Sequence, residues 1–298
     1  MTTLAARRIA KERLELEKPN DDYFVHFNDE NLLHFDAYVV GPADTPYQHK
    51  LALLRFEIPA RYPLVPPVVK FIQHTGHRIH PNLYVEGKVC LSILGTWPGE
   101  PWAYGMTCHT ILVTIRSLLD DKPYKHEPNQ NDNPAFNKFV EYSSWRCMLL
   151  DYLARAPNQA SREFITRHIS NHGEAMRAAL AAQAIENRRL KEFSSPYLRG
   201  RRPDNDQHLR VEYPKLQSEL ESAIEKANMA VRASSPVKRG LEEDVTPSSS
   251  AHGKLHDGVQ QKRIKQSDGA TDDDVASDGM AGGSTTSAKP VPEVIDLT

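Results

Sequence analysis

The sequence has only three cysteines in 298 residues, Cys90, Cys108 and Cys147. Their odd number and irregular spacing match neither a set of disulfides nor the ligand pattern of a metal site. We therefore expect no metal site, and a reducing compartment, either the cytosol or the nucleus.

Long apolar runs and a strong excess of one charge are also missing. No stretch approaches the roughly 20 apolar residues that span a bilayer, and the N-terminus lacks the apolar core of a signal peptide. The formal net charge is −2, whereas nucleic-acid binding relies on clustered Lys and Arg. The sequence predicts a soluble protein whose partners include neither membrane nor nucleic acid.

Aromatic residues are missing from the last part of the chain, since all of them precede position 215. From Ser234 onward, Ser, Gly, Asp, Lys and Pro dominate, and such a segment buries too little apolar surface to offset its ordering entropy. We predict a domain over residues 1–156, a helical extension over 157–232 and a disordered tail over 233–298.

An α+β fold follows from the order of the apolar patterns. Short apolar runs at 33–40, 51–58 and 68–72 are separated by turns rich in Pro and Gly, which predicts an antiparallel meander packed on helices. Residues 61–90 have many prolines and little periodicity, which indicates a long loop-rich passage. Helical patterns predict helices over residues 4–18, 107–119, 134–153, 161–193 and 213–231.

One cysteine stands in a run that is typical of acyl transfer. Residues 80–94 read His-Pro-Asn-Leu-Tyr-Val-Glu-Gly-Lys-Val-Cys-Leu-Ser-Ile-Leu, which puts the Cys90 thiol eight residues after the Asn82 amide. A thiolate can take an acyl group from another thioester, and an amide donor can stabilise the oxyanion formed when that group moves on. Alternatively, free cysteines are often small buried apolar side chains. We expect that role for Cys108 and Cys147.

This run resembles the active-site segment of ubiquitin-conjugating enzymes, which carry ubiquitin-like proteins as thioesters. The similarity extends over about residues 4–153 through motifs in the family's order, namely Gly41-Pro42, Thr45-Pro46-Tyr47, Tyr62-Pro63, Pro66-Pro67, Gly95-Thr96-Trp97, Trp102, Pro123-Tyr124 and Glu127-Pro128. The long loop after the cysteine is most similar to the branch called ubiquitin-conjugating enzyme Z. The resemblance implies the ubiquitin-conjugating fold.

The resemblance also implies roles for the residues before the cysteine. Asn82 would stabilise the oxyanion, or shape the loop that does so, and the sequence leaves both roles open. An asparagine that only stabilises a turn is a further alternative. His80 and Pro81 would support this loop, so His80 would not act as a base.

The acceptor lysine must lose a proton before it attacks, which costs about 4–5 kcal/mol at pH 7. Many family members have an aspartate where this chain has Ser92, so this chain lacks an acid at that position. Glu127 matches the family's other gating carboxylate and would orient the amine, with His126 beside it. Trp102 matches a buried tryptophan of the family, which leaves Trp97 as a cover for the site.

Two surfaces match regions that bind other proteins of the pathway. In the family, the first helix docks the activating enzyme and the ligase, although a solvated basic face is the alternative for its cations, Arg7, Arg8 and Lys11. A proline-rich loop matches a ligase contact, although a rigid turn would also explain its residues, Tyr62, Pro63 and Pro66.

The last residues form an apolar island with an acid in the predicted tail. This island resembles a SUMO-interacting motif, of the kind that adds a strand to a partner's sheet, and consists of Val294, Ile295, Asp296 and Leu297. It predicts SUMO as a further partner, although chance apolar residues also occur in tails.

The combined prediction is an enzyme that accepts ubiquitin on Cys90 from an activating enzyme and passes it to a substrate lysine, usually with a ligase. It needs no metal or organic cofactor, because the activating enzyme consumes the ATP. One alternative is a SUMO-type conjugating enzyme, and another is a non-catalytic scaffold of the same fold. Scaffold members of the family lack the active-site cysteine, so the presence of Cys90 favours the enzyme.

Overall fold

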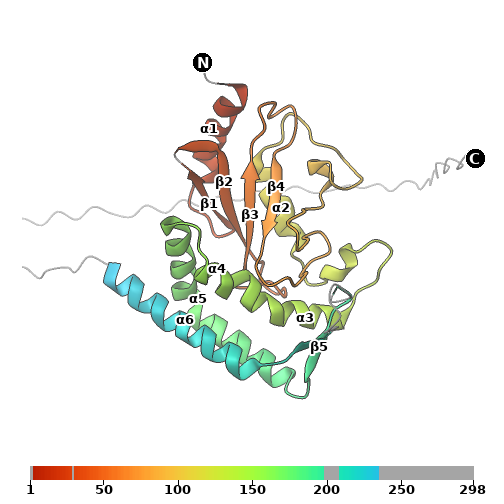
Figure 1. Ribbon diagram of the computed structural model, residues 1–298, viewed down its shortest axis with the longest axis vertical. Helices are drawn as coiled ribbons and strands as arrows, with labels where there is room; N and C mark the ends of the chain where they lie inside the picture. The colour runs from red at the N-terminus through yellow and green to blue at the C-terminus, as the bar shows by residue number, and fades with distance from the viewer. Residues whose placement is uncertain (1–2, 29, 198–207, 235–298) are drawn as a thin grey trace, which may run out of the picture. The chain divides into compact units, whose positions relative to one another are not determined.

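The computed structural model describes residues 3–28, 30–197 and 208–234, and confirms the α+β fold (Figure 1). Its main sheet is an antiparallel meander in the order β1-β2-β3-β4. These strands are Tyr23–Asn28, Asn31–Val40, Leu51–Glu57 and Val68–Ile72. The first strand was not predicted, because its six residues include His26 and Asn28 and only Val25 and Phe27 are buried.

Six α-helices are assigned within the described ranges. They are α1 (Leu4–Leu16), α2 (Cys108–Leu118), α3 (Pro134–Trp145), α4 (Asp151–Ala154), α5 (Gln159–Glu186) and α6 (Tyr213–Ser234). Helices α1 and α2 contact β2, and α5 and α6 lie side by side (Figure 1). Helix α1 begins where the Thr3 hydroxyl accepts from the Ala6 N–H, a standard N-cap.

The helix predicted over 134–153 is interrupted by a π-helical turn. Helix α3 ends at Trp145, the π turn η3 covers Arg146–Leu150, and α4 follows. All three central side chains of the turn, Cys147, Met148 and Leu149, are buried. A π turn is rare and shifts the helical phase, so a search for the 3.6-residue period does not find it.

The helix predicted over 161–193 ends seven residues early, which corrects that prediction. Asn187 caps α5, since its Nδ2 donates to the Gln183 carbonyl (3.0 Å) and to the Tyr213 hydroxyl (3.1 Å). Phe193 instead lies in the short strand β5 (Glu192–Ser194), which pairs with β6 (His208–Arg210). Asparagine is common where helices end, so Asn187 was the residue in the sequence that could have predicted the end of α5.

The predicted boundary at residue 156 falls between α4 and α5, and the division there into a domain and an extension stays a prediction. The predicted tail, apart from residues 233 and 234, lies outside the described residues. Within the described ranges, every helix is too short or too polar to cross a lipid bilayer.

Histidine side chains of α5 contact His49, which lies in the loop before β3. His168 Nε2 donates to the carbonyl oxygen of His49 across 3.0 Å, and the His172 ring lies 4.9 Å from the His168 ring. Burial lowers the pKa of His168 to about 4, and burial together with the charge of Lys50 lowers the pKa of His49 to about 4. Both rings are therefore neutral in the folded protein near pH 7.

We predict that acid destabilises the fold through these rings. An unfolded histidine titrates near pH 6.5, so between about pH 6.5 and 4 the unfolded chain binds more protons and the free energy of unfolding falls as pH falls. One such group contributes at most about 1.4 kcal/mol per pH unit. Urea denaturation at pH 5 and pH 7 should show a smaller difference for His168→Gln than for the unmodified chain. The exposed His34→Gln is the control, and an unchanged difference in His168→Gln would contradict the prediction.

Candidate active site

The structure brings Cys90 and Asn82 together through two hydrogen bonds. The Cys90 N–H donates to the Asn82 carbonyl (2.9 Å), and Asn82 Nδ2 donates to the Cys90 carbonyl (2.8 Å). The intervening residues turn back at Gly87, whose φ of +97° is a conformation that favours glycine. A local turn thus converts a separation of eight residues into direct contact.

Thr96 fixes the backbone on both sides of Cys90. Its hydroxyl accepts from the Leu91 N–H (2.9 Å) and donates to the Val89 carbonyl (2.6 Å). The turn η1 (Ser92–Leu94) and Gly95 bring it back into reach. Thr96 appeared in the sequence only as part of a motif, and its contact with the cysteine segment was not predicted.

Cys90 is covered in this structure, with 1% of its surface exposed. It nevertheless lies outside the apolar core cluster, which includes both Cys108 and Cys147. Burial raises the pKa of the Cys108 thiol, and raises that of Cys147 to about 12, so neither is a ready nucleophile. The loop after Cys90 is closely packed, because a Cβ on Gly99 would lie 3.0 Å from the Ser92 Cβ.

His80 is fully buried and both of its ring nitrogens are engaged. Its Nδ1 accepts from the Asn82 N–H (3.0 Å), and its Nε2 lies 2.9 Å from the Leu118 carbonyl, which can only accept. The ring is therefore the neutral Nε2–H tautomer, and burial, with the charge of His126, lowers its pKa to about 3. This arrangement supports the loop and leaves no lone pair for a base.

A second segment lies against this loop. The turn η2 (Pro123–His126) brings the His126 ring to 5.0 Å from the His80 ring, and His126 Nε2 donates to Asp120 (2.8 Å). Glu127, the next residue, accepts a hydrogen bond from the Tyr197 hydroxyl (2.5 Å). Sequence reasoning did not find Tyr197, which lies 70 residues away.

The two tryptophans after the cysteine have different surroundings. Trp102 is half-buried, its Nε1 donates to the Pro63 carbonyl (2.8 Å), and its ring lies 5.9 Å from that of Tyr62. Trp97 is 40% exposed. Trp102 thus connects the long loop after the cysteine, here called the inserted loop, to the proline-rich loop predicted to contact ligases.

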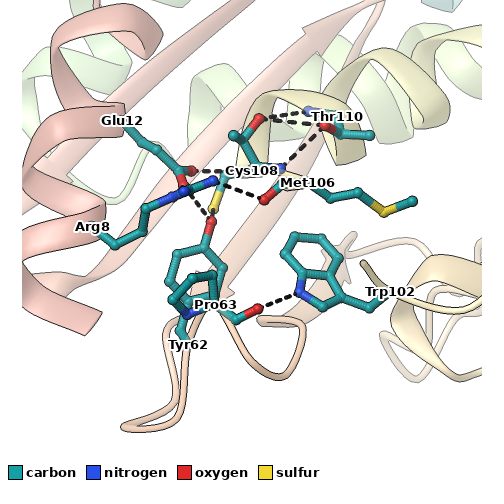
Figure 2. A network of polar contacts seen from close by, with 9 residues as sticks. Arg8, Glu12, Tyr62, Pro63, Trp102, Met106, Cys108 and Thr110 are labelled. Atoms are coloured by element: carbon teal, nitrogen blue, oxygen red, sulfur yellow. Dashed lines mark hydrogen bonds and ion pairs between the residues drawn. The ribbon is translucent and has the colours of Figure 1, made fainter. Parts of the chain in front are cut away.

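Figure 2 shows that a buried carboxylate, that of Glu12, also binds this proline-rich loop. Glu12 accepts from Arg8 Nε (2.6 Å), the Tyr62 hydroxyl (2.6 Å) and the Cys108 N–H at the start of α2 (2.9 Å). A carboxylate is favourable there, because a helix N-terminus carries partial positive charge. Helix α1, the loop and α2 are fixed to one another through this single side chain.

The residues predicted to contact partners therefore divide into two groups. Arg7 and Lys11 are exposed, and Pro66 is half-buried. Arg8 is hydrogen-bonded to Glu12, and Tyr62 and Pro63 are buried. Their side chains therefore stabilise the first helix and the proline-rich loop rather than facing a partner. Leu64, which was not predicted, is 60% exposed on the same loop. The four predicted SUMO-contact residues at 294–297 lie outside the described residues.

Comparison with known proteins gives a consistent result. A model of the family "Ubiquitin-conjugating enzyme" matches residues 8–140. Ubiquitin-conjugating enzyme E2 Z of Danio rerio is 36% identical over 156 residues, which cover 49% of this chain and 47% of that protein. Its namesake in Homo sapiens is 34% identical over 156 residues, covering 49% and 44%. The chain spans about half the length of these curated relatives.

A longer alignment includes part of the extension. The Mus musculus protein "Dual E2 ubiquitin-conjugating enzyme/E3 ubiquitin-protein ligase BIRC6" is 30% identical over 279 residues, covering 82% of this chain and 6% of that protein. Similarity to this relative therefore continues beyond the residues that the family model matches.

We predict that His80→Ala destabilises the fold strongly. The change leaves the Asn82 N–H and the Leu118 carbonyl without their buried partner, and each unpaired group costs about 1–3 kcal/mol. Urea denaturation should show a loss of about 2–6 kcal/mol in the free energy of unfolding. The control is His126→Ala, which breaks a partly exposed pair and should cost about 1 kcal/mol or less. Equal small losses in the two variants would refute a structural role for His80.

Proposed function

We propose that this chain accepts ubiquitin as a thioester on Cys90 and passes it to a substrate lysine, since residues 8–140 match the model of the ubiquitin-conjugating enzyme family. The observation that carries the proposal is the direct hydrogen bonding of Asn82 to Cys90 within the family's active-site motif. An activating enzyme is the partner that this chemistry requires, and a ligase usually takes part in the second transfer.

The reaction has two acyl transfers. In the first, the Cys90 thiolate attacks the thioester carbonyl of the charged activating enzyme, and that enzyme's thiolate leaves. In the second, a neutral lysine amine attacks the new thioester, the tetrahedral intermediate collapses, and the Cys90 thiolate leaves as an amide bond forms. The amine gives up a proton in this step, and ATP is consumed only upstream, by the activating enzyme.

Asn82 supplies the donor for the second transfer. Its side chain is held by one bond, from Nδ2 to the Cys90 carbonyl, and its Oδ1 is buried without a hydrogen-bond partner among the described residues. An amide nitrogen carries two hydrogens, so a second donor is available for an oxyanion that forms at Cys90. A side chain held by a single bond can also reorient as the acyl group arrives.

Before Cys90 can accept ubiquitin, the residues that cover its side chain must move. The side chain is 1% exposed, whereas a nucleophile must come within about 3–3.5 Å of the carbonyl carbon that it attacks. The inserted loop from Gly95 to Trp102 carries the exposed Trp97 and packs through Gly99 against Ser92. We propose that this loop opens when the activating enzyme docks.

Glu127 orients the acceptor lysine. Ser92 occupies the position where many family members have an acid, and Glu127 matches the position of the family's other gating carboxylate. It is half-buried, next to His126 in the turn that contacts His80. A carboxylate there would attract the lysine ammonium and accept a hydrogen bond from the amine as it loses its proton.

The experiment that tests the enzyme assignment is thioester formation. The full chain is incubated with activating enzyme, ATP and ubiquitin, and separated on a gel without reductant. A thiol-sensitive band shift should appear, vanish in Cys90→Ala and resist thiols in Cys90→Ser, because an oxygen ester forms instead. Cys108→Ala is the matched control and should load normally, since that thiol lies in the core.

Two alternatives give different results in this assay. Loading with SUMO and not with ubiquitin would indicate a SUMO-type enzyme, which the similarity to ubiquitin-conjugating enzymes E2 Z does not favour. No loading with either modifier would indicate a scaffold and overturn the proposal.

We also propose that the C-terminal residues at 294–297 bind SUMO by adding a strand to its sheet. Deleting residues 294–298 should weaken SUMO binding at least tenfold, roughly the effect of losing 1.4 kcal/mol, as measured by calorimetry, with unchanged thioester formation. Deleting residues 284–288, a segment of equal length without apolar side chains larger than alanine, is the control. Equal SUMO binding by both deletions would refute the motif.

We place this activity in the cytosol or the nucleus. The three cysteines are all free, and disulfides accumulate mainly in oxidising compartments. The proposed chemistry also depends on a reduced Cys90.

A further inference from the structure

Tyr197 reaches the proposed active site from outside the residues that match the family. It follows β5 in the chain, 57 positions after residue 140, where the match ends. Its ring lies 5.4 Å from that of Phe136 and 6.1 Å from that of Tyr124, which belongs to η2. The extension is thus in contact with the segment that carries Glu127.

A cation also lies over the Tyr197 ring. The Arg78 guanidinium lies between two aromatic rings, 3.6 Å from the centroid of Tyr84 and 4.3 Å from that of Tyr197. Arg78 also donates to the Pro81 carbonyl, the residue before Asn82. Aromatic and cation–π contacts on several sides leave the Tyr197 hydroxyl little freedom to turn away.

The hydroxyl donates a hydrogen bond to Glu127. Tyr197 Oη lies 2.5 Å from Glu127 Oε2, within the range for a hydroxyl bound to a carboxylate. Burial, and then the bond to Glu127, raises the pKa of Tyr197, so the hydroxyl keeps its proton near neutral pH and can only act as the donor to this carboxylate. The second carboxylate oxygen, Oε1, can still accept a bond from an incoming amine.

We propose that Tyr197 is a positioning residue for the transfer to lysine, in which its hydroxyl holds the Glu127 carboxylate in the orientation that receives the acceptor amine. This inference rests on the proposed function and adds a residue of the extension to the proposed site. Tyr197 acts through Glu127 and takes no part in loading Cys90. The extension then contributes to the rate of the second transfer as well as to stability.

The test measures discharge of the preloaded Cys90–ubiquitin thioester to free lysine in a single turnover, over a range of lysine concentrations. Tyr197→Phe keeps the ring and removes the hydroxyl. It should load at the normal rate and discharge about tenfold more slowly, as expected for loss of a hydrogen bond to a charged group. Tyr213→Phe is the matched control, because it removes another hydroxyl of the extension, one that bonds Asn187 and not Glu127.

A double-mutant cycle separates positioning from general destabilisation. If Tyr197 acts through Glu127, then Tyr197→Phe should have no further effect on discharge in the Glu127→Gln background. Tyr197→Phe and Tyr213→Phe should also unfold at similar urea concentrations. Coupling between Tyr197 and Glu127 together with normal loading supports the inference.

Other outcomes overturn it in distinguishable ways. Normal loading and normal discharge in Tyr197→Phe refute the positioning role and leave the proposed function intact. A discharge defect that is equally large in the Glu127→Gln background refutes an action through Glu127. Failure of the unmodified chain to load ubiquitin refutes the proposed function itself, and this inference with it.

Discussion

The pair of hydrogen bonds between Asn82 and Cys90 is the interaction on which the rest of the site depends. It closes the loop that carries the cysteine and brings an amide donor against the residue where an oxyanion would form. His80 supports it from below, because its buried ring connects the Asn82 N–H to the end of α2 at Leu118. The backbone of Asn82 is thus attached to the helix that packs on the sheet, which fixes the position of the residue that carries the amide donor.

Two other regions are fixed to this centre by single polar groups. Glu12 joins α1, the loop at Tyr62 and the first turn of α2, and Trp102 connects that loop to the insertion after the cysteine. On another side, Tyr197 joins the extension to Glu127. A displacement of the loop at Tyr62 would therefore act on the insertion near Cys90, and a displacement of the extension would act on the carboxylate.

Local patterns predicted most of the elements. The strands β2, β3 and β4 and the helices α1 and α2 appear within a few residues of their predicted bounds, since each has a clear apolar period or a breaker at its end. The errors lie where tertiary contacts outweigh local preference. β1 is stabilised by pairing with β2, Phe193 lies in a strand paired with β6, and the π turn at Arg146–Leu150 fits buried side chains into the core.

By itself, the sequence determined which groups are near one another along the chain, because it puts a thiol, an amide and a glycine that favours a turn within one short run, and this predicted the chemistry proposed for the site. Only the tertiary structure decided that Cys90 is covered, that Arg8 and Tyr62 face inward, and that Tyr197 meets Glu127. The physical reason is separation along the chain. A contact across 70 residues depends on how the intervening helices and strands pack together, and short-range periodicity carries no information about that packing.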